Sequence, residues 1–196
     1  MEKIKREIFG EEHPYTAESY HLLGNLYEEQ GRNEIATKYF QKSLQIRQKI
    51  LGEEHPDTAE SYHNVAMLLE KQGKDKDAMM NYQKALQISM KIHGEEHSFT
   101  AKIYNNIGII FGKQRKYEDS MQYFQKALQI RQKVFGEEHP DVAASYNFIG
   151  VLLNNQGRYD DAVKYYQKSL QIREKIYGLE HPDTAESYNN IGVLLE

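Results

Sequence analysis

A strictly periodic internal repeat constrains the fold of this chain more than any other feature. The tetrapeptide Gly-Glu-Glu-His occurs at residues 10–13, 52–55, 94–97 and 136–139, and a variant, Gly-Leu-Glu-His, occurs at residues 178–181. Every copy begins at the same interval after the previous one, without insertion or deletion. The sequence therefore predicts an array of equivalent units, in which side chains one repeat apart have the same packing role.

The histidine that ends each tetrapeptide gives natural boundaries for the units. We expect residues 1–13 to be the end of a preceding repeat, and residues 182–196 to be the first helix of a truncated fifth repeat. Together with the complete units, these segments form a single array over residues 1–196. The four complete repeats are residues 14–55, 56–97, 98–139 and 140–181.

Inside a unit, the apolar residues have a helical period. In repeat 1, Ala17, Tyr20, Gly24 and Tyr27 fall at the spacing of one stripe of an α-helix. Gly31 follows this stripe at a position that suits a left-handed helix end. We therefore expect two helices in each unit, helix A at residues 14–29 and helix B at residues 33–51 of repeat 1.

A long coiled coil is excluded, although the period of the repeat equals six heptads. Glycine, and in most units proline, interrupt the helical pattern twice in each unit, before three heptads can accumulate. One pair of helices cannot bury its apolar surface alone, whereas stacked pairs share a continuous core. The sequence thus predicts an all-α chain of stacked antiparallel helix-turn-helix units, an α-solenoid.

Helix A and helix B resemble those of the tetratricopeptide repeat, a family of paired antiparallel helices. Repeat 1 has Tyr20, Leu23-Gly24 and Tyr27 in helix A, and Ala36, Phe40 and Ser43 in helix B, where the family has aromatic and small residues. The family's proline near the end of helix B is missing, and this column reads Gln48, Met90, Gln132 and Glu174. The 42-residue length and the Gly-Glu-x-His-Pro junction are similar to the repeats of kinesin light chains.

The resemblance implies a right-handed superhelix that acts as a non-catalytic scaffold for protein–protein interactions. In the family, successive helices A line a concave groove that holds an extended peptide. We refer to the surface formed by residues 18, 21, 25 and 28 of repeat 1 and their equivalents as the A face. Two alternatives stay open, a purely structural spacer and a regulatory module of a larger multidomain protein.

The A face combines a column of amides and imidazoles with an apolar column. Asparagine side chains can donate to and accept from a peptide backbone, and the apolar column can hold side chains. The acidic residues gather in the first two repeats, so we expect basic peptide residues there and acidic ones near the lysines of repeat 3. The candidate site residues are His21, Asn25, His63, Met67, Lys71, Lys102, Asn105, Ile109, Lys113, Asn147, Val151 and Asn189.

Neither the histidines nor the paired glutamates predict a reaction centre. Histidines one repeat apart are separated by two helix layers, too far to share a metal ion, so we expect them to pack or cap at helix entrances. The paired glutamates have no apolar pocket to separate their pKa values, and no nucleophile elbow or phosphate-binding loop is present. We predict no enzymatic activity, no metal and no cofactor.

The composition argues against a nucleic-acid partner. With 25 basic and 29 acidic residues, the chain lacks the excess of positive charge that favours binding to a phosphate backbone. The absence of cysteine excludes disulfides, and no apolar run approaches the length of a membrane span. We expect a soluble cytoplasmic protein whose ligand is a protein or peptide.

Some features of the sequence predict weak points or exposed surface. Arg115 stands where other repeats have glycine between the helices, so we expect a strained left-handed residue and a loose turn at residues 113–117. Repeat 2 has Lys-Asp-Lys-Asp at residues 74–77 in place of the aromatic residue that begins helix B in repeats 3 and 4, so we expect a loose turn at residues 73–77 as well. Gly112 is expected on an exposed helix face. The last helix ends in apolar residues without a following helix B, which suggests head-to-tail self-association with another copy.

Overall fold

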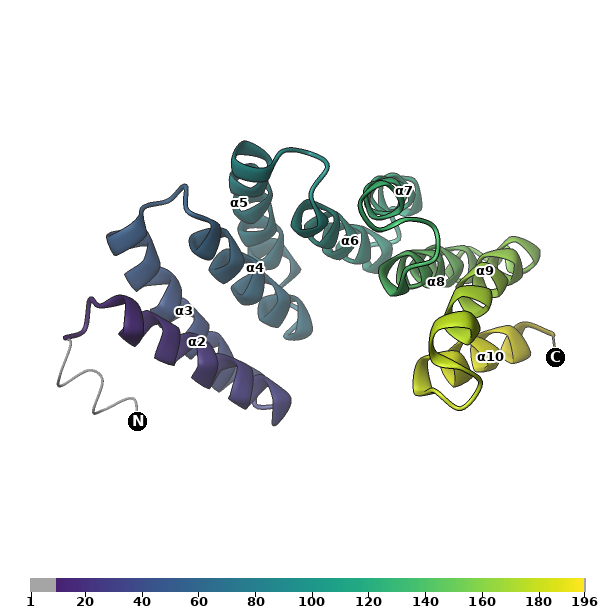
Figure 1. The fold of residues 1–196 in the computed structure, drawn as a ribbon, viewed down its shortest axis with the longest axis horizontal. Helices are drawn as coiled ribbons and strands as arrows, with labels where there is room; N and C mark the ends of the chain where they lie inside the picture. Colours follow the sequence, from purple (N-terminus) through teal and green to yellow (C-terminus); the bar gives the residue numbers. More distant parts are fainter. Residues whose placement is uncertain (1–9, 196) are drawn as a thin grey trace. The chain divides into compact units, whose positions relative to one another are not determined.

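The computed structural model describes residues 10–195, and these residues form nine helices and no strand (Figure 1). The helices A and B that the sequence predicted are confirmed, with the expected bounds in repeat 1. The helices are α2 (Pro14–Glu29), α3 (Asn33–Leu51), α4 (Pro56–Lys71), α5 (Asp75–His93), α6 (Ser98–Lys113), α7 (Tyr117–Phe135), α8 (Pro140–Asn155), α9 (Tyr159–Tyr177) and α10 (Pro182–Leu195). The result is an all-α repeat fold.

The chain divides into two compact units, residues 1–94 and residues 95–196. Unit 1 contains the pairs α2–α3 and α4–α5, with α3 packed against α4. Unit 2 contains the pairs α6–α7 and α8–α9, with α7 packed against α8 and α9 against α10. Within each unit, helices A and B therefore alternate as stacked layers.

The repeated histidine starts each helix A. In the first helix, the Nδ1 atom of His13 accepts a hydrogen bond from the backbone N–H of Tyr15 at 3.2 Å, which satisfies one of the free donors of the first turn. A proline at the first helical position fixes the backbone angle that the helix needs. The expectation that the histidines cap helix entrances is thus confirmed. The equivalent caps are His55, His97, His139 and His181.

The turns between helices depend on left-handed residues. Gly31 has a φ angle of 71° and Gly52 one of 87°, values that side chains rarely permit. Arg115 has a φ of 59° and is the non-glycine residue of the described chain with a positive φ. The expected left-handed conformation at this position is confirmed.

Small residues allow helix A and helix B of one pair to approach closely. An added Cβ atom on Gly24 would lie 2.6 Å from the Phe40 ring, and one on Gly150 would lie 2.6 Å from the Tyr166 ring. Since such distances are shorter than van der Waals contact, the ring of helix B packs directly on the backbone of helix A. In unit 2, Tyr166 joins Phe124 and Leu152 in the core.

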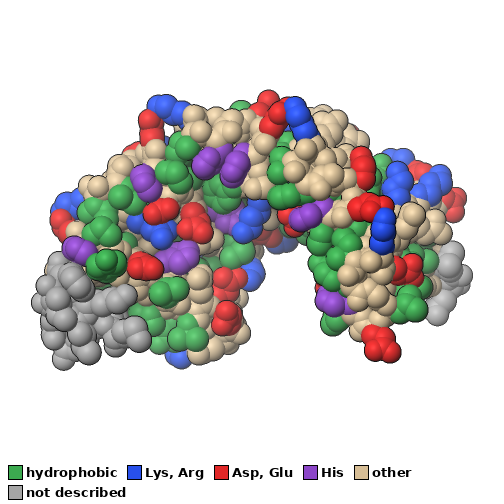
Figure 2. Space-filling model, viewed as in Figure 1, with side chains coloured by type: hydrophobic (Ala, Val, Ile, Leu, Met, Phe, Trp, Pro, Cys, Tyr) green, Lys and Arg blue, Asp and Glu red, His purple; other side chains and the backbone are tan. Residues whose placement is uncertain are grey.

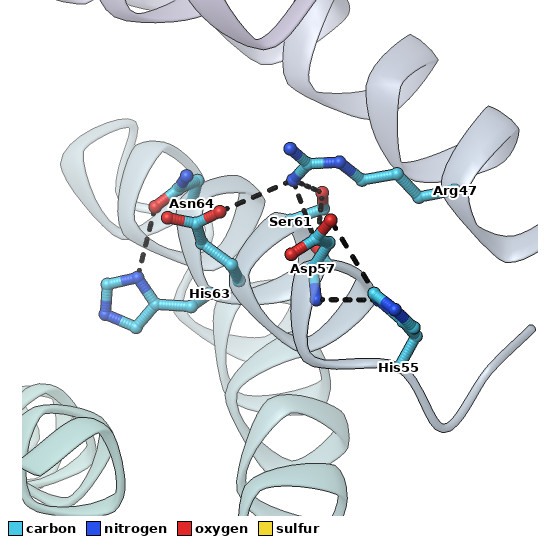
Figure 3. A network of polar contacts seen from close by, with 7 residues as sticks. Arg47, His55, Asp57, Ser61, His63 and Asn64 are labelled. Carbon is cyan, nitrogen blue, oxygen red and sulfur yellow. Dashed lines mark hydrogen bonds and ion pairs between the residues drawn. The ribbon is translucent and has the colours of Figure 1, made fainter. Parts of the chain in front are cut away.

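An arginine in helix B fastens the next helix A. Arg47 is buried, and its Nη1 atom donates to the carbonyl oxygen of Asp57 at 3.0 Å and to Ser61 Oγ at 2.8 Å (Figure 3). In unit 2, Arg131 and Arg173 make the same two contacts with the next helix A. We refer to this arrangement as the arginine staple.

The glutamine that replaces the family's proline also joins neighbouring repeats. Gln48 Nε2 donates to the hydroxyl oxygen of Tyr62 at 2.8 Å, and Gln132 Nε2 donates to that of Tyr146 at 3.2 Å. Burial raises the pKa of Tyr62 to about 12, with the adjacent Glu53 adding to the shift. The departure from the family pattern therefore adds a polar contact between repeats.

The tyrosine column lies mostly in the core, as expected. Tyr20, Tyr62, Tyr104 and Tyr146 are buried. Tyr188, in α10, is 48% exposed.

Candidate functional site

The imidazole column of unit 1 lies under the surface. His63 is fully buried, and its Nδ1 atom lies 3.2 Å from Asn64 Oδ1. His21 is half-buried, and its Nδ1 atom has no hydrogen-bond partner in the protein. Burial lowers the pKa of His21, with Glu60 opposing and Arg47 adding to the shift. In this conformation His63 cannot contact a peptide without a rearrangement of α4.

The other candidate residues of unit 1 include a closed ion pair. Asn25 and Met67 are half-buried, and Lys71 is exposed. Lys71 Nζ lies 2.7 Å from Glu28 Oε1 and links helix A of repeat 2 to helix A of repeat 1. In this ion pair the charges of Glu28 and Lys71 compensate each other, so the two side chains are already partners of one another on the A face of unit 1.

The candidate residues of unit 2 divide into buried amides and accessible side chains. Asn105 is 3% exposed and Asn147 8% exposed, so the amide column is mostly covered. Ile109 is half-buried, and Val151 is 39% exposed. Lys102 and Asn189 are exposed, and Lys113 lies at the end of α6.

Four of these residues meet at one apolar hollow of about 410 Å³ in unit 2. Ile109 and Lys113 come from α6, and Asn147 and Val151 come from α8. This volume lies within the range of about 300–1,000 Å³ that is typical of ligand pockets. The other lining residues are Gly112, Phe124, Phe148, Leu152, Asn155 and Glu186.

An aromatic pair forms one wall of the hollow. The rings of Phe124 and Phe148 stack with centroids 5.8 Å apart and an interplanar angle of 20°. Phe148 occupies a column that has Leu22 in repeat 1, Asn64 in repeat 2, Asn106 in repeat 3 and Asn190 after repeat 4. Phenylalanine in place of the asparagine of repeats 2 and 3 thus makes the surface beside the A face apolar in repeat 4.

Gly112 forms part of the lining, and this corrects the expectation that it lies on an exposed face. A Cβ atom at this position would lie 3.3 Å from Ser120 Oγ and 3.6 Å from Leu152 Cδ1. The glycine therefore faces α7 and α8. Its equivalent in repeat 1 is Glu28, the partner of Lys71.

The polar groups of the hollow are fixed by neighbouring side chains. Asn190 Nδ2 donates to Asn147 Oδ1 at 3.1 Å, which leaves the Asn147 amide nitrogen as the donor of that side chain. Glu186 Oε2 accepts from Arg173 Nη1 at 3.1 Å, so its charge is compensated by the arginine staple. Lys113 adds a cationic side chain to the rim.

The loop glutamates are partners in structural contacts. Glu53 accepts hydrogen bonds from Gln48 and from the hydroxyl of Tyr62, both within unit 1. Glu54 forms an ion pair with Lys91, and the same contact recurs between Glu138 and Lys175. Figure 2 shows acidic and basic side chains interspersed on the viewed face.

The described residues lack both a metal-binding cluster and a membrane-spanning helix. Over residues 10–195, no group of three or more histidine, aspartate or glutamate side chains is arranged to hold a metal ion. Within the same residues, no helix combines the length and the apolar character that crossing a bilayer requires.

Several lining residues of the hollow were not among the sequence candidates. Phe124 belongs to helix B and packs as a core residue, so its column gives no sign of access to solvent. Asn155 could have been found, because it replaces a charged residue of its column, whereas the column of Phe148 already has an apolar member, Leu22. Glu186 lies on the next helix A, and only the stacking of α8 and α10 brings it to the hollow.

Comparison with protein families matches the tetratricopeptide repeat at residues 23–91, 100–141 and 141–196. The chain belongs to the tetratricopeptide repeat family. Arrays of this family are generally non-catalytic scaffolds for protein interactions. A search of curated proteins gave no match.

Solved structures with this fold include kinesin-light-chain-type repeat proteins. BtubC (BKLC) from P. vanneervenii is 29% identical, with a TM-score of 0.79, and the alignment covers 92% of this chain and 72% of that one. A putative kinesin light chain of Podosopora anserina with nearly identical TPR-like repeats is 21% identical, with a TM-score of 0.75, and the alignment covers 93% and 86% of the two chains. The second likeness shows the fold alone.

Proposed function

We propose that this chain is a protein-interaction module that binds a peptide on the A face of unit 2. The observation that carries this proposal is the apolar hollow between α6 and α8, which has Ile109 and Val151 in its lining. Apolar surface that is open to water favours a partner that covers it. The Asn147 amide nitrogen and the exposed Asn155 can hydrogen-bond to a peptide backbone beside the hollow.

The proposal favours an extended peptide over a small metabolite. The hollow is an open feature of the helical surface with polar residues on its margin, and the described residues contain no group of side chains that could hold a metal ion. An extended chain can place one side chain in the hollow and align its backbone with the amides of helix A. The tetratricopeptide repeat family, which generally supplies interaction scaffolds, is consistent with this use.

The test begins with a display library of random 12-residue peptides selected on the purified chain. An enriched sequence is then synthesised with a fluorescent label and titrated by fluorescence anisotropy. Val151→Glu places a charge at the margin of the hollow, and we expect at least a tenfold loss of affinity. Val193→Glu is the matched control, because Val193 occupies the same column in α10, is 65% exposed and does not line the hollow.

Two results would overturn the proposal. One is a failure to enrich any peptide against the folded chain. The other is equal loss of affinity in Val151→Glu and Val193→Glu, because this would place the peptide elsewhere on helices A.

A further inference from the structure

One pair of positions differs between the two units at the point where neighbouring helices A meet. In unit 1 these positions hold Glu28 and Lys71, whose charged groups lie 2.7 Å apart and connect α2 to α4. In unit 2 the equivalent positions hold Gly112 and Asn155, which line the hollow between α6 and α8 and cannot form an ion pair. The same place in the repeat is therefore bridged in one unit and open in the other.

Residues beside this pair are also more apolar in unit 2 than in unit 1. Unit 1 has Asn25 where unit 2 has Ile109, and Asn64 where unit 2 has Phe148. Both exchanges replace an amide by an apolar side chain at the junction of α6 and α8. The apolar lining and the missing ion pair thus occur together, in unit 2.

Ser120 gives a further sign that this site is built around the glycine. Its column has alanine in the other repeats, at positions 36, 78 and 162. Ser120 is fully buried, and its hydroxyl donates to the Gly108 carbonyl oxygen at 2.7 Å. Because a Cβ atom on Gly112 would come within 3.3 Å of this hydroxyl, the two exchanges fit each other.

We propose that positions 112 and 155 determine specificity, so that unit 2 accepts a large apolar side chain of the peptide and the ion pair of unit 1 excludes it. This inference rests on the proposed function and names the ligand chemistry of the same site. Burial of an apolar side chain against Phe124, Phe148 and Leu152 removes apolar surface from water on both partners.

The acidic residue of the hollow does not select a cationic ligand, because Glu186 is already bound to the Arg173 guanidinium. The expected ligand is therefore a peptide that places a leucine, methionine or phenylalanine against the apolar lining.

The test transfers the unit 1 residues into unit 2. The variant Gly112→Glu/Ser120→Ala/Asn155→Lys reproduces the combination of Glu28, Ala36 and Lys71. N-acetyl-leucine methylamide is the probe, and methyl NMR reports on Ile109, Val151 and Leu152. We expect shifts of these methyl groups in the natural chain and their loss in the variant. The selected peptide should bind the variant at least tenfold more weakly.

A converse variant and a control keep the result interpretable. Glu28→Gly/Lys71→Asn removes the ion pair of unit 1, and we expect the leucine probe to shift the methyl group of Met67 in this variant alone. Ser120→Ala alone should leave probe binding in unit 2 unchanged. Circular dichroism and the melting temperature establish that each variant is folded, and if the triple variant does not fold, the converse variant decides the question.

The outcomes separate this inference from the proposed function. If the triple variant folds and binds probe and peptide as well as the natural chain does, positions 112 and 155 are not specificity-determining, although Val151→Glu can still show that the peptide lies there. Equal probe binding by the natural unit 1 and unit 2 would also overturn the inference. If Val151→Glu weakens peptide binding but the triple variant leaves it unchanged, the result would support the proposed function and reject the specificity mechanism.

Discussion

Removal of one arginine staple is expected to destabilise unit 2 at the junction of α7 and α8. Arg131 is 7% exposed, and its Nη1 atom donates to the Asp141 carbonyl oxygen at 3.1 Å and to Ser145 Oγ at 2.7 Å. Arg131→Met keeps the aliphatic stem and deletes both hydrogen bonds. Ser145 Oγ keeps a partner, because it also donates to the Asp141 carbonyl oxygen at 3.1 Å.

The magnitude follows from two opposing effects. Hydrogen bonds that involve a charged group contribute about 1.5–3 kcal/mol each. The variant also avoids the cost of burying the guanidinium, a cost that is visible in the pKa of Arg131, which burial lowers. We expect a net loss of about 2 kcal/mol in the free energy of unfolding of unit 2.

Hydrogen exchange read by mass spectrometry is the suitable assay, since repeat arrays can unfold in parts. Amides of the first turns of α8 should exchange faster in Arg131→Met by a factor of about 30, which corresponds to about 2 kcal/mol. Arg158→Met is the control, because Arg158 is exposed and its ion pair with Asp161 at 2.7 Å lies on the surface. Equal exchange in Arg131→Met and Arg158→Met would refute the role of the staple.

Three further predictions concern pH, strain and association. Because burial lowers the pKa of His21, the unfolded chain protonates this side chain more readily than the folded chain does, and the free energy of unfolding should fall as the pH drops below about 6.5. His21→Asn should reduce that fall in urea titrations, and an unchanged pH profile would contradict the prediction. Arg115→Gly should raise the stability of unit 2 by about 0.5–1 kcal/mol in chemical denaturation, because glycine adopts a positive φ without strain, although it also increases the entropy of the unfolded chain. A loss of stability would contradict the predicted strain. Head-to-tail self-association predicts a sedimentation coefficient that rises with concentration and that Val193→Glu holds constant; a constant value for the natural chain would exclude it.

The repeat made most of the fold predictable from sequence. The helix bounds followed from Gly31 and Pro56, since a left-handed glycine ends one helix and a proline begins the next. The histidine caps followed from their place before each helix A. The arginine staple was not predicted, because Arg47 and Ser61 belong to different repeats, and only packing shows that they meet.

The candidate site was less predictable, because exposure depends on the neighbouring helix. His63 and Asn105 are polar residues in a column that periodicity assigns to a surface, yet both are buried. Ile109 and Val151 were found because apolar residues are unusual on a hydrated face. Gly112 was misplaced, since a glycine without a side chain carries no periodic signal of its orientation.

A crystal structure of the chain with a selected peptide tests the central claim most directly. That claim is that equivalent positions pack alike throughout the array and that binding occurs where unit 2 departs from the repeat. The account predicts a large apolar side chain of the peptide between Ile109, Phe148 and Val151, with the peptide backbone beside Asn147. A peptide bound to the helices B of unit 2, or seated on the Glu28–Lys71 pair of unit 1, would contradict it.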